Sequence, residues 1–161
     1  MILLKKLVYL SMANLNFNQD LKLGNEGEKI IIEFLINKGS KLIDTNNDNK
    51  YDIRMVKNDK ITSYEVKTDV FCAPLFDSGN LFVEFESRKK PSGISVTTAD
   101  WFVTYFKYLN EAWFIKTTKL KKIIQNDKLP VFKNAGDLGS ETHGYLLNRK
   151  EYKNQFHVFK I

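Results

Sequence analysis

Two short segments of alternating character, joined by a turn, constrain this chain most. Residues 50–55 and 61–68 alternate between apolar and polar side chains, and Asn58-Asp59 lies between them. Successive side chains of a strand face opposite sides of a sheet, and Asn and Asp favour tight turns. The sequence therefore predicts an antiparallel hairpin whose two strands place their polar side chains on a shared face.

Three charged side chains of this hairpin form the first candidate site. Glu65 and Lys67 share one face of their strand, and the hairpin brings Asp52 of the neighbouring strand close to Glu65. Two carboxylates beside an ammonium group suit a site that holds a divalent cation and positions water for phosphodiester hydrolysis. The backbone carbonyl of Val66, between the two functional side chains, is a third candidate ligand. The alternative is that Glu65 and Lys67 form an ordinary ion pair on a solvated strand.

The remaining pattern predicts helices around a sheet. Apolar residues at helical spacing predict a helix over 29–39, about three turns long, that ends at Gly39. Further strands are expected at 81–87, 101–106 and 112–116, and a closing helix at 117–125. Residues 41–44 form a short apolar run, and 145–147 and 156–159 are expected to be late strands or packing segments. This order predicts a mixed α/β (α+β) domain with a central mixed sheet flanked by helices.

Length and hydropathy indicate one domain. At 161 residues the chain can bury one core, and we divide it into an N-terminal extension or dimer contact (1–22), a catalytic core (23–126) and a C-terminal excursion and packing segment (127–161). The turn formers of 130–144 predict a surface excursion. Two lysines interrupt the apolar start, so we expect neither export nor a membrane span, and place the protein in the cytoplasm.

Charge and composition narrow the partners. The 25 Lys and Arg exceed the 19 Asp and Glu, giving a net charge of +6 that favours polyanions such as nucleic acid. The single cysteine, Cys72, excludes an internal disulfide and any multi-cysteine zinc site. His143 and His157 have no partner at metal-ligand spacing. The composition thus favours a nucleic-acid partner without zinc or redox chemistry.

Glu28 and a basic segment are further candidates. Glu28 either adds a carboxylate to the site or closes a capping box with Asn25, and both roles place it in the first turn of its helix. Glu84 is a candidate support for the metal site from its own strand. Phosphate contacts are expected from donors of the segment 84–100, namely Arg88, Lys89, Lys90, Ser92, Thr97 and Thr98. The alternative is an ordinary basic hairpin loop.

The order Gly24-x-x-x-Glu28, Tyr51-Asp52, Glu65-Val66-Lys67 resembles the PD-(D/E)xK nuclease superfamily. The resemblance covers about residues 24–116 and implies a restriction-endonuclease-like αβββαβ core. It implies Asp52 and Glu65 as metal ligands, Lys67 as the catalytic lysine and Glu28 as the helix carboxylate that completes the site. Two departures stand out. Tyr51 replaces the proline of the motif, and Asp44 and Asp48 compete with Asp52 as the first carboxylate.

Within that superfamily the chain looks most like small Holliday junction resolvases and related phage endonucleases. This implies a Mg²⁺-dependent endonuclease, with Mn²⁺ as a substitute, that cuts branched DNA as a homodimer. We expect Lys67 to orient or deprotonate water, since a neighbouring metal lowers the pKa of a lysine. The alternatives are a duplex, single-strand or RNA nuclease of restriction or repair type, and a nucleic-acid-binding module without turnover.

Overall fold

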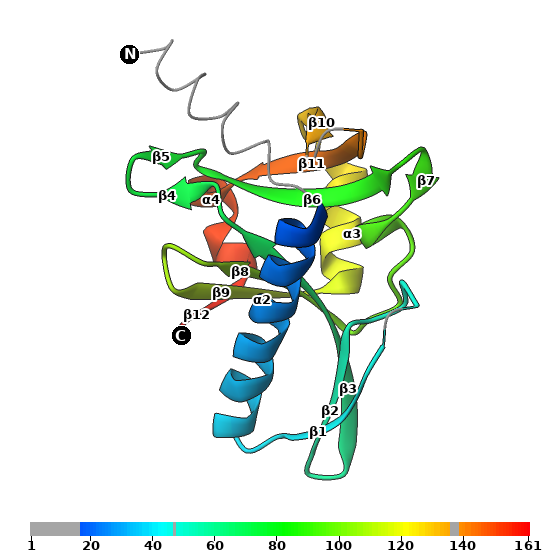
Figure 1. Ribbon diagram of the computed structural model, residues 1–161, viewed down its shortest axis with the longest axis vertical. Helices are drawn as coiled ribbons and strands as arrows, with labels where there is room; N and C mark the ends of the chain where they lie inside the picture. The colour runs from blue at the N-terminus through cyan, green and yellow to red at the C-terminus, as the bar shows by residue number, and fades with distance from the viewer. Residues whose placement is uncertain (1–16, 47, 136–138) are drawn as a thin grey trace.

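The computed structural model describes residues 17–46, 48–135 and 139–161. These residues form a mixed α+β fold in which helices flank a central sheet, as predicted (Figure 1). The helices are α2 (Phe17–Asn37), α3 (Thr117–Asn126) and α4 (Arg149–Tyr152), with 3-10 turns η1 (Gly93–Ser95) and η2 (Lys153–Gln155). The strands are β1 (Lys41–Thr45), β2 (Ile53–Lys57), β3 (Lys60–Asp69), β4 (Cys72–Ala73), β5 (Phe76–Asp77), β6 (Asn80–Ser87), β7 (Lys90–Pro91), β8 (Trp101–Phe106), β9 (Glu111–Lys116), β10 (Val131–Ala135), β11 (Thr142–Asn148) and β12 (His157–Lys160).

Six strands of the described residues form the central sheet, in the order β1-β2-β3-β8-β9-β12. β3 and β8 run parallel, and every other neighbouring pair is antiparallel. A parallel neighbour requires a crossover connection. The chain between β3 and β8 contains β4 to β7 and η1, where the αβββαβ order would have an α-helix. The connection therefore carries a second sheet instead of a helix.

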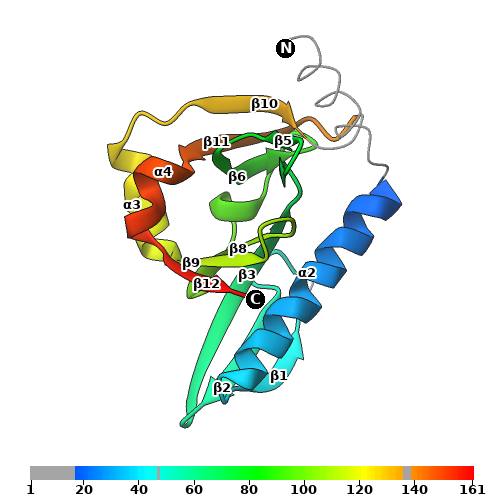
Figure 2. The same cartoon turned by 90° about the vertical axis from the view of Figure 1, so that its left-hand side faces the viewer.

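Helix α2 covers one face of the central sheet (Figure 2). Its Ile31 and Leu35 are buried against Tyr64 and Val66 of β3. Gly27 lets the helix approach β3 closely, because a Cβ at this position would lie 1.9 Å from Oγ1 of Thr68. This close approach brings the next residue of the helix, Glu28, toward the polar residues of the β2–β3 hairpin.

Helix α2 begins earlier than the sequence predicts. The helix already begins at Phe17, so Asn25 lies inside it and is not its N-cap. The capping box proposed for Asn25 and Glu28 is therefore wrong, and Glu28 stands near the middle of the helix. The predicted end is confirmed: Gly39 follows α2 with φ +91°, a left-handed conformation that glycine adopts readily.

A second sheet covers the opposite face of the central sheet. It has the order β10-β11-β6-β7 within the described residues, and its apolar side chains share a core with β8, β9 and α3 (Figure 2). Leu81 and Val83 of β6 and Leu147 of β11 are almost fully buried there. The strand predicted at 81–87 is confirmed, but it belongs to this second sheet. The molecule thus has three layers: α2, the central sheet and the second sheet.

The C-terminal segment is more integrated than predicted. β11 pairs with β6 and β12 pairs with β9, so residues after 127 supply strands to both large sheets. The surface excursion predicted for 130–144 is wrong for the start of β11, which is largely buried in the second sheet, whereas β10 forms a mostly exposed edge strand of that sheet. Residues 1–16 lie outside the described residues, and 17–22 open α2. No helix of the described part of the chain is long and apolar enough to cross a membrane.

Candidate active site

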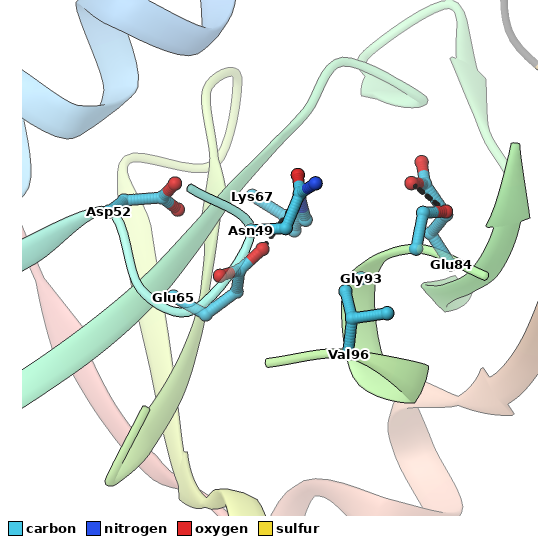
Figure 3. A pocket seen from close by; sticks show the side chains of 8 residues that line it. Asn49, Asp52, Glu65, Lys67, Glu84, Gly93 and Val96 are labelled. Carbon is cyan, nitrogen blue, oxygen red and sulfur yellow. Dashed lines mark hydrogen bonds and ion pairs between the residues drawn. The ribbon is translucent and has the colours of Figure 1, made fainter. Parts of the chain in front are cut away.

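A pocket of about 160 Å³ opens between the two large sheets. Figure 3 shows Asp52, Glu65 and Lys67 grouped together and Glu84 on the opposite wall. The first three side chains come from the β2–β3 hairpin, whereas Glu84 comes from β6. The full lining consists of Asn49, Asp52, Glu65, Lys67, Glu84, Ser92, Gly93 and Val96. The structure therefore brings together three of the four side chains predicted to be catalytic, and adds Glu84.

Hairpin pairing positions Asp52, as predicted. The backbone N–H of Asp52 donates to the carbonyl of Tyr64 at 2.9 Å, and the Asp52 carboxylate accepts from the Val66 N–H at 2.6 Å. Asp52 stands just before β2, so its carboxylate accepts the Val66 N–H in place of a backbone carbonyl of a paired strand. The N–H and C=O of one strand residue project to the same side. The Val66 carbonyl therefore faces the edge where Asp52 lies.

Glu65 is the most deeply buried charge in the pocket. The residue is 4% exposed, and its Oε1 lies 2.9 Å from Nζ of Lys67, whose side chain is 35% exposed. The other oxygen, Oε2, is buried and accepts no hydrogen bond from any described residue. A buried carboxylate oxygen without a partner is costly. The pair is thus not the solvated surface ion pair considered from sequence, because half of the carboxylate remains unsatisfied.

Glu28 approaches this group from α2, although it does not line the pocket. Burial, together with the charges of Asp52 and Glu65, raises its pKa from 4.5 to about 7, while the charge of Lys67 acts in the opposite direction. The charges of Asp52, Glu65 and Lys67 all act on the pKa of Glu28, and its neighbour Gly27 packs closely on β3. The role of Glu28 as the helix carboxylate of the site stays a prediction.

The pKa values of Asp52 and Lys67 are shifted by the same close grouping of charged side chains. Burial and the charge of Glu65 raise the pKa of Asp52 to about 6, against the opposing effects of Lys67 and the Val66 N–H. Burial disfavours the Lys67 ammonium, but the carboxylates of Glu65, Glu84 and Asp52 outweigh it and raise the pKa of Lys67. The lowered lysine pKa expected beside a metal stays a prediction. Lys67 is a cation here at neutral pH.

The donor set fits Mg²⁺. Among the described residues, no three His, Cys, Asp or Glu side chains converge closely enough to form a complete metal cage. Mg²⁺ rarely uses such a cage, since it is bound by one or two carboxylates and takes its remaining ligands from water and phosphate. Asp52, Glu65 and the Val66 carbonyl offer oxygen atoms that could hold such an ion, and Oε2 of Glu65 has no hydrogen-bond partner among the described residues.

The two rival carboxylates are placed elsewhere. Asp44 lies in β1 and forms an ion pair with Arg54, whose hydrogen bond lowers the Asp44 pKa. Asp48 lies in the turn before the pocket, and neither it nor Asp44 lines the pocket. Of the three candidates for the first carboxylate, Asp52 is the one that lines the pocket. Cys72 is buried, and burial raises its pKa, which suits a packing residue.

The predicted phosphate-binding residues divide into two groups. Arg88, Lys89 and Lys90 are exposed at the tip of the β6–β7 hairpin. In contrast, Ser92 donates to Glu84 at 2.6 Å inside the pocket. Thr97 and Thr98 also bond within the protein.

The two threonines hold the chain that precedes the hairpin. Thr97 is 1% exposed and its hydroxyl donates to the carbonyl of Lys50 at 2.9 Å, which also accepts from the Thr98 N–H at 2.9 Å. A buried hydroxyl bonded in this way does not reach a phosphate. Thr97 instead fixes the loop that carries Asn49 and Asp52.

Sequence reasoning missed Asn49, Gly93 and Val96 as lining residues. Asn49 has φ +62°, and Gly93 has φ +50°, where a Cβ would meet the Glu84 carbonyl oxygen at 2.4 Å. The glycine thus lets η1 lie against β6 and close the pocket. The polar turn at 45–49 and the Pro-Ser-Gly sequence before η1 were available signals for backbone of this kind.

Comparison with known proteins gives a limited fold likeness. No family model matches this chain, and no curated protein matches it. A solved structure described as a bacterial homing endonuclease, I-Ssp6803I, is similar over 59% of this chain and 67% of its own, with 15% identity and a TM-score of 0.47. A likeness of this degree assigns no role to any residue here. The resemblance to PD-(D/E)xK nucleases remains a prediction from the motif.

Proposed function

We propose that this protein is a Mg²⁺-dependent endonuclease that hydrolyses phosphodiester bonds in DNA. The observation that carries the proposal is the unsatisfied carboxylate of Glu65, which lies in one pocket with Asp52 and Lys67. Like charges held together in a buried site need a cation to offset them. Such an arrangement is expensive for the fold alone and is explained by a metal-binding role.

Each residue has a specific task in this proposal. Asp52, Glu65 and the Val66 carbonyl hold Mg²⁺, or Mn²⁺ in its place, and the bound ion polarises phosphate and activates water. Lys67, cationic at neutral pH, binds and orients a phosphate oxygen or the attacking water. With a pKa of about 7, Glu28 exchanges a proton near neutral pH and hydrogen-bonds water in either form.

The choice of DNA as the substrate rests on the charge of the protein. The choice of branched DNA rests on the motif. A net charge of +6 and the exposed basic hairpin favour a polyanion. We further propose that the preferred substrate is branched DNA, cut by a homodimer in the cytoplasm of a bacterium or a phage-infected host. A twofold dimer would match the paired cleavage points of a junction. Light scattering of the purified protein at several concentrations measures the oligomeric state, and a monomer at all of them would contradict the dimer.

A substrate panel tests the function. Labelled four-way junction, duplex DNA, single-stranded DNA and RNA are incubated with Mg²⁺ or chelator, using wild type, Glu65→Ala and Lys67→Ala. Lys60→Ala is the matched control, since Lys60 is exposed at the other end of β3. We expect cutting that requires Mg²⁺ and is lost in both site variants but kept in the control. Cutting that survives both site substitutions would reject the site.

The same panel separates the alternatives. Cleavage of unbranched duplex, single strands or RNA without junction cleavage would reject the resolvase specificity and leave the nuclease chemistry in place. Binding without cleavage of any substrate would reject the enzyme in favour of a nucleic-acid-binding module.

A further inference from the structure

The tip of the β6–β7 hairpin has an unusual turn. Ser87 pairs with Lys90, so Arg88 and Lys89 form a two-residue loop, with φ values of +52° and +60°. Positive φ at both positions is typical of the type I′ two-residue loop, which favours Asn-Gly or Asp-Gly. Long basic side chains at both positions oppose the backbone preference. Strained positions of this kind occur where the side chain has a use outside the fold.

The β2–β3 hairpin provides an internal comparison. Lys57 pairs with Lys60, and its two-residue loop, Asn58-Asp59, also has positive φ at both positions, +49° and +59°. Asn and Asp tolerate this conformation better than other residues with a side chain. The same chain thus uses favourable residues in one hairpin of this form and unfavourable basic ones in the other.

The basic tip continues directly from the pocket. Glu84 of β6 and Ser92, just after β7, line the pocket, and the strands between them lead to the tip. Arg88 follows Glu84 by four residue steps, which at about 3.4 Å per residue is roughly 14 Å. Double-stranded DNA rises about 3.4 Å per base pair. The tip therefore reaches about four base pairs from the pocket.

The side chains at the tip are exposed. Lys89 is 81% exposed, with Glu141 3.7 Å away as a weak partner, and Lys90 is exposed beside it. The interval between tip and pocket lets one duplex contact both.

We propose that Arg88 and Lys89 contact backbone phosphates of a DNA duplex about four base pairs from the bond held in the pocket. The inference rests on the proposed function for its partner, but it concerns binding and not cleavage. Phosphate contacts of this type fix the register of a duplex and add affinity without reading bases. The tip would therefore set where along the duplex the pocket acts.

The test uses two double variants that both remove the charges of the tip but differ in their effect on the backbone of the turn. Arg88→Asn with Lys89→Gly removes both charges and relieves the turn, whereas Arg88→Gln with Lys89→Gln removes the charges alone. Duplex affinity is measured by fluorescence anisotropy in chelator, so that it does not depend on cleavage. Thermal unfolding of the same samples reports the turn.

We expect both variants to bind duplex DNA more weakly. Each phosphate contact contributes about 0.9 to the slope of log affinity against log salt, so the loss of two contacts lowers this slope by about 1.8. Over the tenfold interval from 1 M to 0.1 M salt, this change in slope corresponds to a Kd that is roughly 60-fold higher at 0.1 M. The Asn-Gly variant alone should unfold about 2–4 °C higher than wild type. A purely structural turn would not combine tighter folding with weaker binding.

Two matched controls separate the effect of the position of the β6–β7 tip from a general loss of positive charge and from a general improvement of a turn. Lys150→Gln with Lys153→Gln removes the same charge from exposed residues of α4 and η2, on the other side of the molecule (Figure 1). Asp59→Gly improves the β2–β3 turn. We expect the first to leave the salt slope near the wild-type value and the second to raise the unfolding temperature without weakening binding.

The inference would be overturned by wild type that does not bind duplex DNA, or by tip variants that bind as tightly as wild type. It would also be overturned by a lysine control that loses as much affinity as the tip variants do. An Asn-Gly variant that unfolds at a lower temperature than wild type would remove the strained-turn argument and overturn it too. Duplex binding that depends on the tip, in a protein that cleaves nothing, would reject the proposed function and leave the inference standing.

Discussion

Removing the charge of Glu28 should stabilise the metal-free protein. Burial and the neighbouring carboxylates raise the pKa of Glu28 from 4.5 to about 7. Since a tenfold change in proton affinity is worth about 1.4 kcal/mol, the ionised carboxylate costs the fold about 3 kcal/mol before screening. Partial exposure of the side chain reduces this, and we expect about 2 kcal/mol. Glu28→Gln should therefore raise the unfolding temperature by about 4–8 °C at pH 8.

The pH dependence gives the sign of the effect. The folded protein holds the Glu28 proton more tightly than the unfolded chain does, so the free energy of unfolding falls as pH rises from about 4.5 to about 7. Below this window Glu28 is protonated in both states and the substitution should change little. Above it the full penalty is present in wild type and absent in Glu28→Gln.

Thermal or urea unfolding in chelator, at pH 4 and pH 8, measures the difference. Glu33→Gln is the control, because Glu33 is exposed on the same helix and should behave alike at both pH values. A Glu28→Gln protein less stable than wild type at pH 8, or equally shifted at both pH values, would refute the electrostatic account of the pocket.

Two glycines test the backbone geometry of the site. Gly27→Ala should lower the free energy of unfolding by about 1–3 kcal/mol because its Cβ would lie 1.9 Å from Oγ1 of Thr68. Thr68→Ala in that background should recover much of the loss in urea unfolding, and no recovery would show that the contact is not the cause. Gly93→Ala should cost a similar amount, since its Cβ would meet the Glu84 carbonyl oxygen at 2.4 Å and φ is positive. Wild-type stability and duplex cleavage in Gly93→Ala would contradict the close packing of η1 on β6.

The local parts of this fold were predictable from sequence. The β2–β3 hairpin is specified by alternation and the Asn58-Asp59 turn, and the hydrogen bond between Asp52 and the Val66 N–H follows from its register. The strand at 81–87 was also predictable, but its membership in the second sheet was not. Its partner, β11, is distant in sequence, and no local pattern encodes such a pairing.

The errors have physical causes. Asn25 and Glu28 match a capping pattern, yet α2 runs on through them from Phe17, so this local signal does not set the start of the helix. The roles of Thr97 and Ser92 depend on contacts with Lys50 and Glu84, which the fold alone creates. Apart from these errors, the raised pKa of Lys67 could not be read from spacing, because it depends on three surrounding carboxylates.

Single-turnover cleavage of the preferred DNA in Mg²⁺ tests the central claim most directly, comparing wild type with Glu65→Gln and Glu86→Gln. Glu86 lies on β6 outside the pocket and serves as the matched glutamate. The account predicts at least a hundredfold loss of rate in Glu65→Gln and a wild-type rate in Glu86→Gln. A Glu65→Gln protein that cuts at the wild-type rate would contradict it.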